Sequence, residues 1–306
     1  MILRTPEQRF SALPDFPFTP HYHTLTHGAG ELRMAYVDEG PRAAPVVLML
    51  HGEPSWSFAY RKVIAAIAKA GYRAVAPDHI GFGRSDKLAD RSAYSYASFI
   101  SWMCDFVSAL DLRDILLVCQ DWGGPIGLST LAAMPERFAG VIAANTLLPN
   151  CEPPPAGVPD WPGDIINAWV AMTRDATDLP VSEIVSGVCV TALSQTVKDA
   201  YDAPFPDASY KAAVLEFPSL IPLRENQPGC AENRAVWALL DQWQKPFVTA
   251  FSDGDPATAA WSDVFRERIP GAANDWHMTI PGAGHFVQEE QGEALAGLVE
   301  RVREAI

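Results

Sequence analysis

The sequence predicts an α/β fold, with a mostly parallel central sheet flanked by helices and a helical cap inserted into the chain. Short apolar runs alternate with stretches whose apolar residues recur at helical spacing, as is typical of parallel strands joined by helices. This alternation breaks near residue 149, where prolines become frequent, and resumes after about residue 226. The 306 residues suffice for one large domain with such an insertion. We therefore predict a core domain of residues 1–148 and 227–306 and a cap domain of residues 149–226.

The individual elements follow from local signals. The run at 46–50 is continuously apolar, as expected for a strand in the middle of a buried sheet. The helix predicted after it stops at Gly71, and a later helix stops before Pro135. The predicted strands are residues 32–38, 46–50, 72–76, 115–118, 141–145, 247–251 and 276–280. The predicted helices are residues 58–70, 96–110, 126–134, 235–243, 257–269 and 292–305.

The composition excludes some classes of partner. The 37 acidic and 23 basic side chains give a net charge of −14, which argues against nucleic acid or an anionic membrane and favours a neutral substrate. The N-terminus lacks the apolar run of a signal peptide, and no apolar stretch reaches the roughly 20 residues of a membrane span. The five cysteines have no CxxC spacing, which predicts free thiols in a reducing compartment. We expect a cytoplasmic monomer.

Residues 115–124 carry the strongest functional signal. A strand leads into a turn with Asp121 at its apex, Cys119 two residues before it and Gly123 two residues after it, and a helix follows. This is the layout of a nucleophile elbow, in which small neighbours expose one reactive side chain. A serine attacking a saturated carbon would leave an ether, whereas Asp121 would leave an ester that water can open. Asp121 therefore predicts displacement at an sp3 carbon followed by hydrolysis.

An elbow nucleophile needs a histidine base and an acid, and in this layout the acid precedes the histidine in the chain. His285 lies in a glycine-rich loop between the last short strand and the terminal helix, where the base is expected. Asp253 and Asp255 both follow the penultimate strand. We favour Asp255 as the acid, because an Asp-Pro step before a helix is the commoner placement, and we interpret Asp253 as a turn residue.

The turn at residues 51–54, His-Gly-Glu-Pro, is predicted to help hold an oxyanion. In this layout the turn supplies one backbone N–H and the residue after the nucleophile supplies the other. The expected donors are the backbone N–H groups of Glu53 and Trp122. The Glu53 side chain has no predicted role, and an ordinary surface acid is the alternative interpretation.

With these residues, the chain resembles the α/β-hydrolase fold and, within it, the haloalkane dehalogenases. The matching motifs span nearly the whole chain after about residue 30. They are HGEPSW at 51–56, PD at 77–78 with GFGRS at 81–85, QDWGG at 120–124, APFP at 203–206 with Tyr210, and GHFVQE at 284–289. The HGxP and DWGG motifs are shared with epoxide hydrolases, whereas the glutamate of HGEP and the APFP segment are more specific to the dehalogenases.

The resemblance implies a small neutral halogenated hydrocarbon and water as substrates, a halide ion as a product, and no metal or organic cofactor. Two indole N–H groups would receive the departing halide, because such donors add no competing acceptor to an apolar pocket. Trp122, beside the nucleophile, is one. In the family branch that uses a cap tryptophan, Trp169 matches the second position better than Trp161, which we interpret as packing at the hinge. In the other branch an Asn takes this role, and Glu53 occupies that place here.

Three alternative interpretations stay open at this point. An epoxide hydrolase would use the same Asp121, His285 and acid, with Tyr201 and Tyr210 of the cap as donors to the epoxide oxygen. A haloacid dehalogenase would need a cationic clamp, and Trp122 stands where that family carries an arginine. A non-catalytic binding module would be expected to lack a member of the triad, and all three are present.

Candidates for the pocket lining in the cap are Phe217, Leu220, Ile221 and Leu223.

Overall fold

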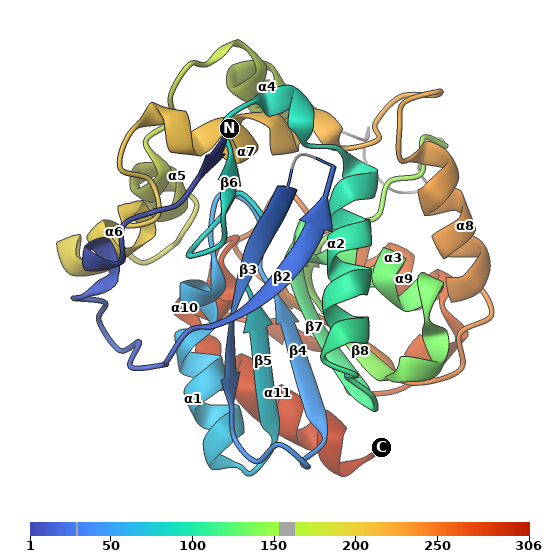
Figure 1. Cartoon of the computed structure of the whole chain (residues 1–306). Helices are drawn as coiled ribbons and strands as arrows, with labels where there is room; N and C mark the ends of the chain where they lie inside the picture. The colour runs from blue at the N-terminus through green and yellow to red at the C-terminus, as the bar shows by residue number, and fades with distance from the viewer. Residues whose placement is uncertain (29, 153–162) are drawn as a thin grey trace.

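The computed structural model describes residues 1–28, 30–152 and 163–306. In this part of the chain an eight-stranded sheet has the order β10-β9-β8-β7-β4-β5-β3-β2 (Figure 1). Neighbouring strands from β10 to β5 pair in parallel, whereas β3 and β2 are antiparallel, so the predicted mostly parallel sheet is confirmed. The strands of this sheet are β2 (His21–His27), β3 (Gly30–Glu39), β4 (Val46–Leu50), β5 (Arg73–Pro77), β7 (Ile115–Asp121), β8 (Phe138–Thr146), β9 (Phe247–Ser252) and β10 (Met278–Ile280). A separate pair joins β1 (Ile2–Leu3) to β6 (Lys87–Leu88).

Helices cover both faces of the sheet, which explains why β4, in its interior, is apolar along its whole length. Alternate residues of β7 show this division, because Leu117 belongs to one buried cluster and Leu116 and Val118 to the other. The first cluster includes residues of α2, α3, α8 and α9, and the second includes residues of α1, α10 and α11. Their bounds are α1 (Arg61–Lys69), α2 (Tyr96–Ala109), α3 (Gly123–Ala133), α8 (Cys230–Leu240), α9 (Trp261–Arg268), α10 (Val287–Glu290) and α11 (Gly292–Glu304).

Some element boundaries differ from the predictions for local reasons. The helix predicted at 58–70 begins with a 3-10 turn, and its α-helical part starts at Arg61. The helix predicted at 257–269 starts only at Trp261, because the Asp255 side chain accepts hydrogen bonds from the backbone of Ala257 and the hydroxyl of Thr258 and so holds a turn there. Strand β2 was not predicted. It is an edge strand whose sequence HYHTLTH is largely polar.

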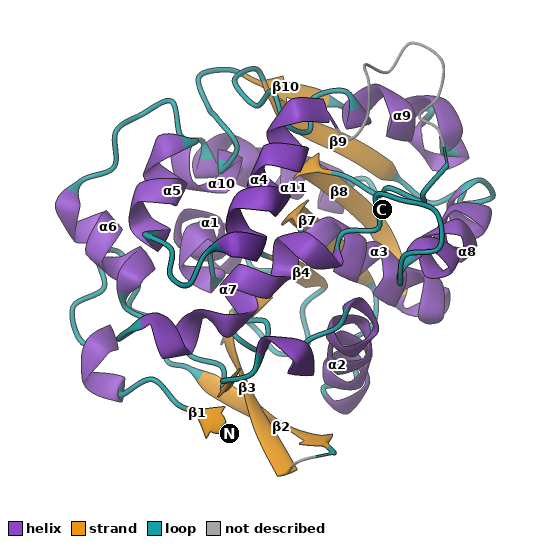
Figure 2. Cartoon of the chain, turned by 90° about the horizontal axis from the view of Figure 1, so that it is seen from above, coloured by secondary structure: helices purple, strands orange, loops and turns teal. Residues whose placement is uncertain are grey.

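Between β8 and α8, the described residues form four α-helices, which we call the cap helices. Figure 1 shows them at the upper end of the sheet, and Figure 2 looks down onto them. They are α4 (Gly163–Asp175), α5 (Val181–Gly187), α6 (Gln195–Asp202) and α7 (Ala212–Glu216). The domain boundaries at residues 149 and 226 stay a prediction. Within the described ranges, no helix combines the length and the apolar character needed to cross a membrane.

Cys151 and Cys230 form a disulfide, with their Cα atoms 5.5 Å apart. The prediction of free thiols is wrong for this pair, whereas Cys104, Cys119 and Cys189 are free. The two partners are 79 residues apart in the sequence, and only the fold brings them within bonding distance. Because Cys151 follows β8 and Cys230 begins α8, the bond joins the two ends of the segment that contains the cap helices.

Replacing Cys151 with serine is expected to lower the free energy of unfolding by about 2–4 kcal/mol under oxidising conditions, because the cross-link restricts a long loop of the unfolded chain. Chemical unfolding without reductant measures this loss, and Cys104→Ser is the matched control with an intact disulfide. In the presence of a reductant the parent and Cys151→Ser should unfold alike. Titration of five reactive thiols in the unreduced, denatured parent would contradict the pairing.

Candidate active site

Asp121 ends β7 in a strained turn. Its φ of 51° lies in the left-handed region, which a non-glycine residue rarely adopts, and this backbone bend turns the carboxylate out of the strand. The neighbours must be small for the turn to fit. A Cβ atom on Gly123 would come 2.1 Å from the Leu50 carbonyl oxygen, and one on Gly52 would come 2.3 Å from Asp121 itself. Gly52 and Gly123, which have no Cβ atom, therefore allow the chain to pack tightly around the carboxylate.

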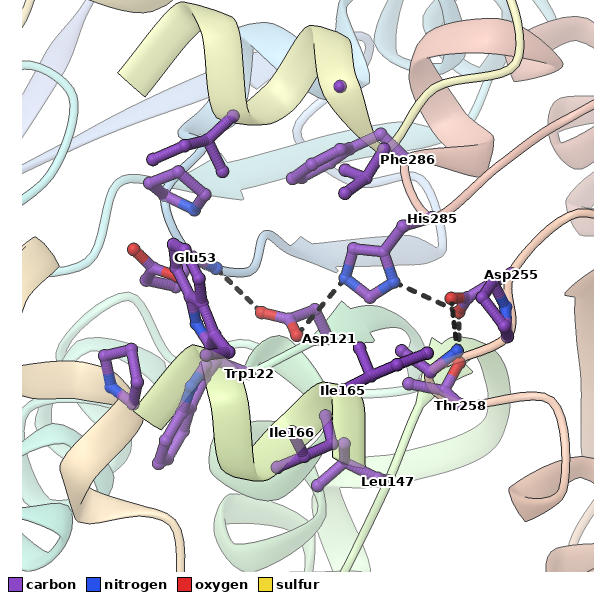
Figure 3. A pocket seen from close by; sticks show the side chains of 18 of the residues that line it. Glu53, Asp121, Trp122, Leu147, Ile165, Ile166, Asp255, Thr258, His285 and Phe286 are labelled. Atoms are coloured by element: carbon purple, nitrogen blue, oxygen red, sulfur yellow. Dashed lines mark hydrogen bonds and ion pairs between the residues drawn. The ribbon is translucent and has the colours of Figure 1, made fainter. Parts of the chain in front are cut away.

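The structure brings the three predicted residues of the triad together (Figure 3). His285 Nε2 lies 3.3 Å from Asp121 Oδ2, and His285 Nδ1 lies 3.0 Å from Asp255 Oδ2. The competing Asp253 is exposed, and its carboxylate accepts a hydrogen bond from the backbone of Gly282, as expected of a turn residue. The histidine thus stands between a nucleophile at a cavity wall and a carboxylate whose side chain is only 1% exposed.

The two carboxylates determine the protonation of His285. Burial would lower the pKa of His285, but Asp255 and Asp121 outweigh burial and raise it to about 10. Burial would likewise raise the pKa of Asp255, but the charge and hydrogen bond of His285, together with the donors Thr258 and Ala257, hold that pKa below its usual range. In the free enzyme at neutral pH, His285 is therefore an imidazolium held between two carboxylates.

Backbone donors surround the nucleophile. The N–H of Glu53 donates to Asp121 Oδ1 at 2.8 Å, so the predicted donor contacts the reacting group. Trp122 takes up the first helical backbone angles before α3, which places its N–H at the N-terminal end of that helix. Both N–H groups are therefore placed to stabilise the negative charge that would form on the carbonyl oxygen of an Asp121 ester during attack.

The Glu53 side chain is part of the site, which the sequence did not indicate. It is 5% exposed and lines the cavity, so the interpretation as a surface acid is wrong. Burial and the nearby Asp121 carboxylate raise the pKa of Glu53 well above its usual range, although His285 and a hydrogen bond with Trp169 oppose the shift. Burial at this position therefore favours the neutral form of the Glu53 carboxyl group.

A cavity of about 560 Å³ separates these residues from the cap helices. It is lined by the triad, by Glu53, by both predicted indoles, Trp122 and Trp169, and by apolar side chains of α4 such as Ile165 and Ile166, which Figure 3 labels. Its described lining residues include no lysine, arginine or tyrosine. Such a cavity suits a neutral, apolar molecule.

Of the other cap residues that the sequence suggested as pocket lining or as donors, only Ile221 is among the described residues that line this cavity. Ile221 lines it, whereas Phe217 packs behind it against Trp122, with ring centroids 4.5 Å apart. Leu220 and Leu223 are not among the lining residues, nor are Tyr201 and Tyr210. The Tyr201 hydroxyl is buried and donates to Glu289 at 2.6 Å. Trp161 lies outside the described residues.

Buried amides support the loop that carries His285, and the sequence did not single them out. Asn145, at the end of β8, donates to the carbonyl oxygens of Gly284 and His285 at 2.9 and 3.0 Å. Gln120, next to the nucleophile, donates to the same His285 oxygen at 3.1 Å. These contacts arise only in the folded chain, because the partners are far apart in sequence. Among the described residues, including those of this site, no group of three or more His, Cys, Asp or Glu side chains is arranged to hold a metal ion.

Comparisons with known proteins agree with this geometry. A family model described as the α/β hydrolase fold matches residues 45–291. The chain is 47% identical over 299 residues to a haloalkane dehalogenase of Psychrobacter cryohalolentis, covering 97% of this chain and 96% of that protein. A haloalkane dehalogenase of Mycolicibacterium paratuberculosis is 41% identical, with 96% of each chain covered. The solved structure of a tetrameric haloalkane dehalogenase of Paraglaciecola agarilytica superposes with a TM-score of 0.89 at 36% identity, covering 100% of this chain and 99% of that one.

Proposed function

The chain belongs to the haloalkane dehalogenase family of the α/β-hydrolase fold, and from this premise we propose that Asp121, His285 and Asp255 carry out the hydrolytic dehalogenation of haloalkanes. The observation that carries the assignment is the position of the Asp121 carboxylate, in contact with His285 and facing an apolar cavity that holds two indoles. A carboxylate nucleophile at this position fits attack on a saturated carbon.

In the first step, an oxygen of Asp121 attacks the carbon that bears the halogen. The carbon–halogen bond breaks as the carbon–oxygen bond forms, and the halide leaves with the bonding electron pair. The indole N–H groups of Trp122 and Trp169 stabilise the charge that develops on it, because donors in an apolar cavity act with little competition from water. The product of this step is an alkyl ester on Asp121.

In the second step, water hydrolyses this ester. Esterification removes the negative charge of Asp121, which is one of the two charges that raise the pKa of His285, so the imidazolium becomes easier to deprotonate. The neutral imidazole then takes a proton from water, and the resulting hydroxide attacks the ester carbonyl. The N–H groups of Glu53 and Trp122 hold the oxyanion, and Asp255 stabilises the imidazolium that forms. This intermediate then collapses: the bond between the Asp121 carbonyl carbon and the alkyl oxygen breaks, the departing alkoxide takes up the proton that the hydroxide carried, and Asp121 is a carboxylate again. The alcohol, the halide and the proton lost earlier by the imidazolium are released.

The epoxide hydrolase alternative is not favoured. Its donors to the epoxide oxygen would be Tyr201 and Tyr210, and neither lines the cavity. A haloacid substrate would need a cation near the nucleophile, and no lysine or arginine is among the described lining residues. The predicted monomeric state and cytoplasmic location stay predictions. The tetramer described for the relative from Paraglaciecola agarilytica concerns that protein.

Two parallel assays test the proposed function. We expect the purified chain to release halide from 1,2-dibromoethane and from longer terminal bromoalkanes, and to form no diol from styrene oxide. Asp121→Ala should abolish halide release, because it removes the group that forms the ester. Diol formation by the parent without halide release, or turnover that survives Asp121→Ala, would refute the assignment.

A further inference from the structure

The cap contributes a short irregular segment, residues 188–191, to the wall of the cavity. It directly follows α5, and Val188, Cys189 and Val190 line the cavity. Val188 and Val190 are 43% and 62% exposed, so they also face the solvent. These residues therefore lie where the cavity meets the surface, and we call them the rim segment.

The rim segment is in direct contact with the loop that carries His285. The backbone N–H of His285 donates to the Val188 carbonyl oxygen at 2.9 Å. Gly284 packs so tightly there that a Cβ atom would come 2.2 Å from the same oxygen. A movement of the rim segment would therefore act on the backbone of His285 itself.

The carboxylate of Glu290 joins the same two segments. Its Oε2 accepts hydrogen bonds from the Gly284 N–H at 2.6 Å and from the Val190 N–H at 3.1 Å, and its Oε1 accepts one from the Thr191 N–H at 2.6 Å. Gly284 precedes the histidine, whereas Val190 and Thr191 belong to the rim segment, about 100 residues away in sequence. One side chain that accepts from three backbone donors joins two otherwise irregular stretches of chain.

We propose, on the basis of the proposed function, that Glu290 is a positioning residue that holds the rim segment and the His285 loop together and so keeps the imidazole in place for ester hydrolysis. The first chemical step does not depend on this contact. The Glu53 N–H donates to the Asp121 carboxylate, and the elbow fixes the Asp121 backbone. The hydrogen bonds of Glu290 go to Gly284, Val190 and Thr191 and so involve neither of these parts. Hydrolysis does depend on it, because a base that is displaced by about 1 Å loses up to about a hundredfold in rate.

The test uses Glu290→Gln, which keeps one acceptor oxygen, and Glu290→Ala, which keeps none. We expect kcat to fall by roughly tenfold or more in Glu290→Ala and by less in Glu290→Gln. The ratio kcat/KM, which reports the steps up to ester formation, should stay within about twofold of the parent, and the alkyl-enzyme should accumulate. Glu293→Gln is the matched control, because Glu293 is an exposed acid three residues further along the chain.

Hydrogen exchange of the same variants gives a readout that does not depend on turnover. In both Glu290 variants the amides of residues 188–191 and of residues 282–286 should exchange faster together, with the sheet unchanged. Equal falls in kcat and kcat/KM, an unchanged kcat, or loosening of only one of the two segments would overturn the proposal. A parent that releases no halide would instead refute the proposed function, so the two failures are distinguishable.

Discussion

Replacing His285 with phenylalanine is expected to stop the reaction after the first step, so that each active site forms one ester and does not hydrolyse it. Asp121 attack needs no base, so each molecule should still release one halide ion and carry an alkyl ester on Asp121. Without an imidazole 3.3 Å from the carboxylate to activate water, the ester should persist. Steady-state turnover should fall by roughly 10³-fold or more, in the range seen when a triad member is removed.

A stopped-flow halide measurement and mass spectrometry of the peptide that contains Asp121 check both parts of this result. His23→Phe is the control, since His23 lies on the edge strand β2 and pairs with Asp105 outside the cavity. It should turn over like the parent. If His285→Phe released halide stoichiometrically but left no mass increase on Asp121, the covalent route would be excluded.

Local sequence signals were sufficient to predict the parts of the site that depend on neighbours in the chain. The elbow at Asp121 follows from small residues around one reactive side chain. The bounds of β4 were predicted without error, because a strand buried on both faces is apolar at every position. The structure also places Asp255 rather than Asp253 beside His285, in line with the Asp-Pro preference.

The remaining features depend on contacts between distant segments. The Cys151–Cys230 bond, the junction at Glu290 and the amides of Asn145 and Gln120 each join residues that no local pattern relates. Glu53 illustrates the same limit. Its residue type was compatible with an ordinary surface acid, whereas its position at the cavity wall buries it and raises the pKa of its carboxyl group. Burial of a polar side chain is a property of the packed structure, and one sequence does not report it.

Replacing Asp255 with asparagine is expected to lower kcat by roughly 10³–10⁴-fold while leaving the halide burst in place. Asp255 accepts a hydrogen bond from His285 Nδ1 at 3.0 Å and so leaves Nε2 free to take a proton from water. Ala257 N–H donates to Asp255 Oδ1, whereas Oδ2 faces both the Thr258 hydroxyl and His285 Nδ1. An asparagine whose oxygen keeps the Ala257 bond would therefore turn its NH₂ group toward Nδ1, and the Thr258 hydroxyl would accept from this group instead of donating. Nδ1 would then become the acceptor, Nε2 would carry the proton, and the base would face the ester in the wrong tautomer.

The same substitution should change how stability depends on pH, and this follows from the sign of the shift at His285. Its pKa rises from 6.5 to about 10 in the folded state, so the imidazolium stabilises the fold below pH 6.5 and this stabilisation is lost as the pH rises through about 10. Asp255→Asn removes one of the charges that raise this pKa. The free energy of unfolding should therefore fall less between pH 7 and pH 10 in Asp255→Asn than in the parent or in Asp253→Asn. An equal fall in all three proteins would show that Asp255 does not hold the imidazolium.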